Sequence, residues 1–201
     1  MALVARPSRR EALHLLASLS GTSALALSAP AAHAQSWRYV LVPPTSLAQV
    51  ERDVERQFSE IGHLATATLA ERIGQGAPII LYDVREEAEF AVSHLNGALR
   101  LEPGLTHAAA LQTIGARTRG RTAVFYCAVG QRSSRMARQV RNALLSSGAL
   151  GVDNLRGGVF AWHNESRPLV DADGPTRFVH PFSTAWGRLL THPDLSAMTP
   201  R

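Results

Sequence analysis

Lysine is missing from this 201-residue chain, and all 21 of its basic residues are arginine. The formal charge of +5 is spread over arginines that alternate with 16 carboxylates, and no long basic run occurs. A protein that binds nucleic acid is expected to gather its positive charge on one stripe or patch. We therefore expect no nucleic-acid partner.

Cysteine is nearly absent as well, because Cys127 is the only one. A single cysteine excludes a disulfide and dithiol chemistry within the chain. The eight histidines are not spaced in close pairs, so we expect no metal site. A lone cysteine is most often an inert, buried side chain. The sequence around Cys127 must decide whether this thiol reacts.

Residues 122–134 predict a strand, a tight loop and the start of a helix, with Cys127 at the base of the loop. Free N–H groups of such a loop, together with the helix dipole, form a cradle for negative charge. Gly130 permits a positive φ angle, and Arg132 adds a full positive charge. This setting lowers the pKa of a thiol, so we expect Cys127 to be a nucleophile. The expected cradle consists of Ala128, Val129, Gly130, Gln131, Arg132 and Ser133.

Three other charged residues are candidates for supporting roles, and the role of Arg132 has two interpretations. Arg132 either binds the anionic end of a substrate or braces the loop through an ion pair. Asp83 and Arg85 could line the site, but a structural ion pair is favoured because a carboxylate beside the sulfur would oppose the thiolate. Arg135 is near enough to the loop to add positive potential.

Apolar strand-like runs alternate with helical patterns along most of the chain. This order predicts an α/β fold with a mainly parallel five-stranded sheet and helices on both faces. Asp83 and Cys127 then fall at the carboxyl ends of strands, where such sheets bind ligands. Strands are expected at 62–64, 79–82, 98–101, 123–127 and 152–154, with helices at 66–73, 86–90, 108–114 and 133–146.

The loop motif Cys-x-x-Gly-x-Arg-Ser at 127–133 resembles the active-site loop of the rhodanese family. Residues 79–98 resemble its Asp-Val-Arg and His-Ile-Pro-Gly-Ala motifs, and residues 154–170 its Leu-x-Gly-Gly-x-x-Ala-Trp and Gly-x-Pro-Val motifs. Asn96 replaces the usual proline, and Ser166 replaces a frequent glycine. The resemblance implies a thiosulfate sulfurtransferase that needs no cofactor. It implies that Cys127 takes sulfane sulfur as a persulfide and passes it to cyanide or a thiol.

Two alternatives stay open. One is a persulfide carrier or binding module that serves an exported protein partner. The other is a cysteine-dependent phosphatase or arsenate reductase, whose loops resemble Cys-x-x-x-x-x-Arg. Arg132 is the fifth residue after Cys127 rather than the sixth, which disfavours this second alternative.

The chain divides into four expected parts. Residues 1–34 resemble a signal peptide of the twin-arginine type, with Arg9-Arg10, an apolar stretch and a small-x-small cleavage site. An ordinary secretory signal and an uncleaved anchor stay open as alternatives. Residues 35–60 form an extension with an amphipathic helix, 61–170 the rhodanese-like domain and 171–201 a tail that packs on it. We expect a periplasmic or otherwise exported bacterial protein with no stable membrane span after processing. Its expected partners are a small anionic sulfur donor and a thiol, cyanide or exported protein acceptor.

Overall fold

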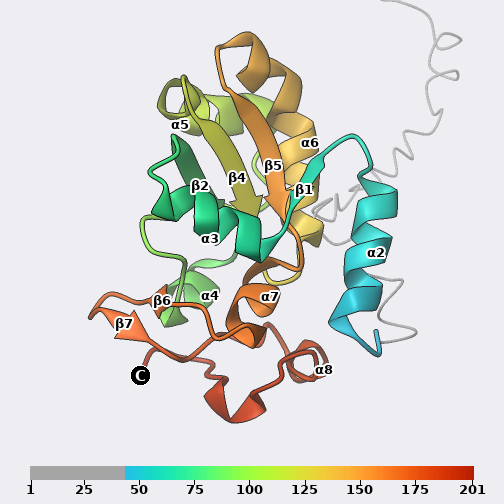
Figure 1. The fold of residues 1–201 in the computed structure, drawn as a ribbon, viewed down its shortest axis with the longest axis vertical. Coiled ribbons are helices and arrows are strands. Elements are labelled where there is room, and N and C mark those ends of the chain that lie inside the picture. The colour runs from blue at the N-terminus through green and yellow to red at the C-terminus, as the bar shows by residue number, and fades with distance from the viewer. Residues whose placement is uncertain (1–43) are drawn as a thin grey trace, which may run out of the picture. The chain divides into compact units, whose positions relative to one another are not determined.

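The computed structural model describes residues 44–201 (Figure 1). The expected signal peptide and the segment that follows it, up to residue 43, lie outside the described residues. Five strands form one sheet in the order β1-β5-β4-β2-β3, and every neighbouring pair is parallel. The strands are β1 (Gly62–Leu64), β2 (Ile79–Asp83), β3 (Leu99–Arg100), β4 (Thr122–Tyr126) and β5 (Gly151–Leu155). The predicted fold class is confirmed.

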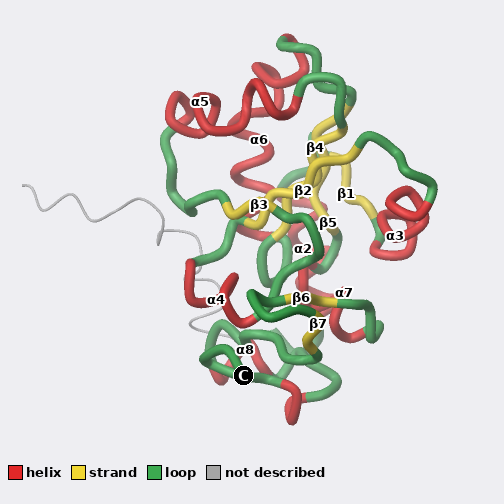
Figure 2. Tube along the Cα trace, turned by 90° about the vertical axis from the view of Figure 1, so that its left-hand side faces the viewer, coloured by secondary structure: helices red, strands yellow, loops and turns green. Residues whose placement is uncertain are grey.

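Helices lie on both faces of this sheet. Figure 2 shows α5 and α6 on one side of the strands and α3 on the other. β4, at the centre of the sheet, is buried from Ala123 to Tyr126, as expected for a strand covered on both faces. The helices are α2 (Leu47–Gln57), α3 (Thr66–Gly74), α4 (Glu87–Val92), α5 (His107–Thr118), α6 (Gln131–Ser146) and α7 (Gly158–Asn164).

α2 begins as the sequence predicts, because the Ser46 side chain accepts a hydrogen bond from the N–H of Gln49. It ends at Gln57 rather than near Ile61. Phe58 leaves the helical conformation, and both Phe58 and Ile61 are buried in the core. Val50 and Val54 make up the buried face of α2, so the helix covers part of the core.

The helix α7 was not predicted from the sequence. Each residue from Gly158 to His163 is buried. A helix that is buried on all sides has no polar face, and the periodic pattern that reveals an amphipathic helix is therefore missing. The strand β4 also ends one residue earlier than expected, which makes Cys127 the first residue of the loop.

The tail packs beneath the carboxyl ends of the strands (Figure 1). Val179, Leu189 and Leu190 belong to the main hydrophobic core, and Ala197 N–H donates to the Val179 carbonyl at 3.1 Å. Within residues 44–201, no helix has the length and apolar character needed to span a membrane. The strand β7 (Pro175–Thr176) of the tail pairs antiparallel with β6 (Leu169–Val170), which precedes the tail. The tail also contains the short helix α8 (Thr184–Gly187) and a 3-10 turn at Pro193–Leu195.

Candidate active site

Cys127 lies where β4 ends and α6 is about to begin, and it is 1% exposed. The turn between them depends on Gly130, which has a φ of +95° and precedes the first residue of α6. A Cβ atom at Gly130 would lie 3.0 Å from Asn154 Nδ2. Glycine is therefore required both for the left-handed conformation and for the close contact with Asn154.

The surroundings of Cys127 stabilise its anionic form. Burial raises the pKa of the Cys127 thiol, but several neighbouring groups lower it by a larger amount. These groups are the Arg132 guanidinium, the Ser133 hydroxyl and the backbone N–H groups of Ser133 and Val129. The net pKa lies below the ordinary value of a cysteine. A larger fraction of the side chain is thus the nucleophilic thiolate.

Arg132 is held by Glu89 of α4. Its two terminal nitrogens donate to the two Glu89 oxygens at 2.7 and 2.8 Å, and Glu89 is only 3% exposed. Burial raises the pKa of Glu89, but the hydrogen bonds and charge of Arg132, together with the charge of Arg85 and the Glu86 N–H, keep it below the ordinary value. The ring of Phe182, from the tail, lies 5.0 Å from the guanidinium carbon. The ion pair foreseen as one interpretation of Arg132 is present, and it keeps the guanidinium close to the sulfur.

Asp83 and Arg85 form a fully buried ion pair of 2.6 Å, which is the structural role favoured from the sequence. Arg85 Nη2 also donates to the Ser93 carbonyl at 2.6 Å. The guanidinium of Arg85 lies 5.8 Å from the centre of the Tyr126 ring. This pair ties β2 to the segment after α4, and no hydrogen bond joins either residue to Cys127 within the described part of the chain.

Arg135 and Gln131 belong to the first turns of α6. Arg135 lies within electrostatic range of Cys127. The pKa of Arg135 is lowered by burial and by the positive charge of Arg138. The Cys127 anion opposes both effects. Gln131 instead turns toward α2, where its Nε2 donates to Gln57 Oε1 at 2.9 Å. The side chain of Gln131 therefore links the start of α6 to α2.

The unpredicted helix α7 supports the loop from below. Val159 N–H donates to the Cys127 carbonyl at 2.9 Å, and Phe160 N–H donates to the Ala128 carbonyl at 3.0 Å. Gly158 has a φ of +57°, and a Cβ atom there would lie 2.3 Å from the Cys127 carbonyl oxygen. Because Gly158 has no side chain, α7 can approach the Cys127 carbonyl closely enough for Val159 N–H to bind it.

Several residues of this arrangement were missed as site residues. Glu89, Asn154 and Phe182 contact the loop or the start of α6 from other parts of the chain. Glu89 and Asn154 lie in segments whose motifs resemble those of the rhodanese family, and this resemblance was the only signal for them. Phe182 lies in the tail and carried no signal at all.

The geometry combines an acidified, buried thiol with loop N–H groups and a fixed guanidinium, which suits attack on an anion. A family model described as the rhodanese-like domain matches residues 65–165. The chain belongs to the rhodanese family. The match spans both the loop of Cys127 and the helix α7 beneath it.

Three curated relatives align with between half and two thirds of this chain. A protein named sulfurtransferase from Allochromatium vinosum is 29% identical over 57% of this chain and 99% of its own. An uncharacterized protein of Synechocystis is 33% identical over 53% of this chain and 55% of its own. The probable adenylyltransferase/sulfurtransferase MoeZ of Mycobacterium tuberculosis is 27% identical over 64% of this chain, which spans about a third of MoeZ (31%).

Solved structures resemble the chain less closely. A thiosulfate sulfurtransferase from Pseudomonas aeruginosa is 18% identical over 62% of this chain and 22% of its own, with a TM-score of 0.47. A rhodanese-like domain from Anabaena gives 21% identity over 54% of this chain and 78% of its own, with a TM-score of 0.45. The fold class follows from the strand order and parallel pairing described above.

Proposed function

We propose that this chain is a sulfurtransferase that moves sulfane sulfur from a thiosulfate-like donor to a thiophilic acceptor. The observation that carries the proposal is the lowered pKa of Cys127 in a loop where N–H groups and Arg132 face the sulfur. A buried thiol is normally a weaker acid, so this arrangement suits a reacting thiolate.

The proposed reaction has two steps. The Cys127 thiolate attacks the outer sulfur of thiosulfate, the sulfur–sulfur bond of the donor breaks, and sulfite leaves with the bonding electron pair. The enzyme then carries a Cys127 persulfide. In the second step cyanide or a thiolate attacks the terminal sulfur, and Cys127 leaves as the thiolate that began the cycle. A covalent intermediate between two substrates predicts ping-pong kinetics.

Arg132 has two parts in this proposal. Its contacts with Glu89 fix the guanidinium beside the loop, and its positive charge stabilises the thiolate and the departing sulfite. The loop N–H groups hold the donor's anionic end and stabilise negative charge on the persulfide.

A partner-dependent persulfide carrier uses the same first step, and the two functions differ only in the acceptor. A phosphatase or arsenate reductase is disfavoured because α6 begins at Gln131, only four residues after Cys127. This short loop offers less room for a tetrahedral oxyanion than for a sulfur atom.

The test is turnover of thiosulfate with cyanide, followed as thiocyanate, in the native protein and in Cys127→Ser. We expect turnover only in the native protein, with both proteins melting at similar temperatures. Ser134→Ala is the matched control, because Ser134 is buried in the first turn of α6 and its hydroxyl has no hydrogen-bond partner within residues 44–201. Turnover by Cys127→Ser, or hydrolysis of an aryl phosphate by the native protein, would overturn the proposal.

We also propose that the protein is exported, on the basis of residues 1–34 alone. Expression of the full chain in a bacterium with both export routes should give a periplasmic protein whose first residue is Gln35. Replacing Arg9 and Arg10 by lysine should retain it in the cytoplasm if the twin-arginine route is used. An uncleaved native protein in the cytoplasm would contradict export.

A further inference from the structure

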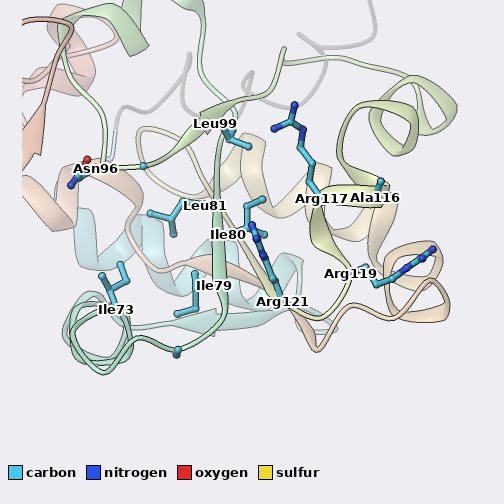
Figure 3. A pocket seen from close by; sticks show the side chains of 12 residues that line it. Ile73, Ile79, Ile80, Leu81, Asn96, Leu99, Ala116, Arg117, Arg119 and Arg121 are labelled. Carbon is cyan, nitrogen blue, oxygen red and sulfur yellow. The ribbon is translucent and has the colours of Figure 1, made fainter.

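A cavity of about 640 Å³ lies at the edge of the sheet beside the first half of β2. Cys127, by contrast, lies at the carboxyl ends of the strands, so this cavity is not part of the site described above. Figure 3 shows β2 from its edge, with Ile79 and Leu81 pointing to one side and Ile80 to the other. Ile73 of α3 flanks the first side, and Arg121 lies beside Ile80 on the second. We call this cavity the β2 groove.

The groove exists because β3 is too short to cover β2. Register pairs β3 only with Tyr82 and Asp83. On its other edge, β2 pairs with β4 along its whole length, from Ile79 to Asp83. The residues Ile79–Leu81 therefore have no strand partner on the side where the groove lies.

The backbone of this open edge has groups that can form a β-ladder. Pro78 C=O and Val84 N–H bond to β4, whereas Asp83 C=O bonds to Leu101 on the β3 side. Alternate residues of a parallel strand turn their polar groups to opposite edges. Ile79 C=O and Leu81 N–H therefore face the groove. The Ile79 N–H is used locally, because it donates to the Ala77 carbonyl at 2.7 Å.

The lining of the groove is positively charged. Its twelve residues include Arg117, Arg119 and Arg121 and contain no aspartate or glutamate. All three arginines are exposed, and no ion pair joins them to a carboxylate within residues 44–201. The apolar part of the lining comes from both sides of β2 and includes Ile79, Ile80, Leu81 and Leu99.

We propose that the β2 groove binds an extended, acidic segment of a partner protein, which adds to the sheet as a strand beside Ile79–Leu81. Strand addition uses main-chain hydrogen bonds for affinity and side-chain pockets for selectivity. Apolar side chains of the segment would contact the isoleucine and leucine residues that line the groove, and its carboxylates would pair with Arg117 and Arg121. Pairing between two copies of this chain is disfavoured, because it would bring two unpaired arginine clusters together.

The experiment uses a fluorescein-labelled peptide of about six alternating valine and glutamate residues, titrated with the native protein and followed by fluorescence anisotropy. We expect saturable binding, and protection of the Leu81 amide from hydrogen exchange when the peptide is bound. Reversing two charges in Arg117→Glu/Arg121→Glu should weaken binding about tenfold or more. The matched control is Arg52→Glu on α2, because Arg52 is an exposed arginine outside the groove and should leave affinity unchanged.

Two control peptides separate strand addition from charge attraction. A central proline removes a ladder N–H and should abolish binding, and lysine in place of glutamate should do the same. The proposal would be overturned if the proline peptide bound as tightly as the valine-glutamate peptide, or if Arg52→Glu lost as much affinity as Arg117→Glu/Arg121→Glu. It would also be overturned if the valine-glutamate peptide did not bind. Concentration-dependent dimerisation that protects the Leu81 amide would assign the groove to a second copy and also overturn it. Thiosulfate turnover should be unchanged in Arg117→Glu/Arg121→Glu, so this test is independent of the proposed reaction.

Discussion

Ser133 Oγ lies 2.6 Å from Asn154 Oδ1, and the hydroxyl of Ser133 has only one proton to donate. The orientation of the Asn154 amide is fixed from its other end, where Nδ2 donates to the Leu155 carbonyl at 3.1 Å. The same Nδ2 lies 3.3 Å from Nδ1 of His63. Asn154 therefore competes with the Cys127 thiolate for the Ser133 proton.

This competition predicts opposite effects from the two partners. Ser133→Ala removes a donor and should raise the pKa of Cys127. Asn154→Ala frees the hydroxyl for the sulfur and should lower that pKa, while the loss of buried hydrogen bonds costs about 1–3 kcal/mol of stability. The pKa can be read from the pH dependence of thiolate absorbance or of alkylation by iodoacetamide.

The double variant and a neighbouring serine serve as controls for the competition. Ser133→Ala/Asn154→Ala should titrate like Ser133→Ala, because Asn154 acts on the sulfur only through the hydroxyl. Ser134→Ala should leave the pKa of Cys127 unchanged, since the Ser134 hydroxyl has no hydrogen-bond partner within the described residues. A raised pKa in Asn154→Ala would show that Asn154 helps Ser133 donate to the sulfur.

The pair of Arg132 and Glu89 predicts coupled effects on stability and on the thiol. Arg132→Ala leaves the Glu89 carboxylate buried without its partner, so it should cost about 3–5 kcal/mol of folding free energy. It should also raise the pKa of Cys127, because a positive charge beside the sulfur is lost. Chemical denaturation measures the first effect, and alkylation rates against pH measure the second.

Removing both charges is the control for this pair. Arg132→Met/Glu89→Leu should be more stable than Arg132→Ala and should still show the raised pKa of Cys127. If Arg132→Ala unfolds too readily for titration, this double variant supplies the measurement. An unchanged pKa in the double variant would show that Arg132 acts only as a brace.

The same pair predicts a loss of stability in acid. The pKa of Glu89 is lower in the folded protein than in the unfolded chain, so its contribution is present above the ordinary value of about 4.3 and disappears as pH falls through the folded value. The stability difference between the native protein and Glu89→Gln should therefore be constant near neutral pH and shrink in acid. A difference that grows as the pH falls would contradict the lowered pKa.

The close contact of Gly158 with the loop predicts a large effect of one methyl group. In Gly158→Ala the new Cβ would meet the carbonyl oxygens of Cys127 and Ala128, and the residue would keep a φ that alanine rarely adopts. We expect a loss of about 2–5 kcal/mol and loss of turnover as the loop shifts.

Gly115 offers a matched control for that substitution. It lies within α5 with no atom in reach of an added Cβ, so Gly115→Ala should gain up to about 1 kcal/mol and keep full turnover. Thermal unfolding and the thiocyanate assay distinguish the two variants. Equal stability of the two alanine variants would mean that the loop does not depend on the close contact at Gly158.

Patterns within short stretches of sequence predicted the features that depend on residues close together in the chain. The apolar run before Cys127, the glycine that precedes α6 and the alternation of strands with helices were all readable, and they led to the correct fold class. The ion pair of Asp83 and Arg85, two residues apart, was also favoured from the sequence. Each of these features is encoded within a short stretch of chain.

Features that depend on distant contacts were not predictable in the same way. Glu89 lies 43 residues from Arg132, and Asn154 lies 21 residues from Ser133. No local pattern specifies such partners, because the strand order brings them together. The fully buried α7 lacked a polar face to reveal it, and β2 has an open edge because its ladder with β3 begins only at Tyr82.

The central claim is that Cys127 carries sulfur, and the most direct test is the intact mass of the purified protein. It should be measured before thiosulfate, after thiosulfate and after subsequent cyanide. The account predicts a gain of one sulfur atom on Cys127 with thiosulfate and its loss to cyanide, with thiocyanate released. An unchanged mass, with a thiol that still reacts with iodoacetamide, would contradict sulfur transfer from thiosulfate and favour a partner-dependent carrier or a phosphatase.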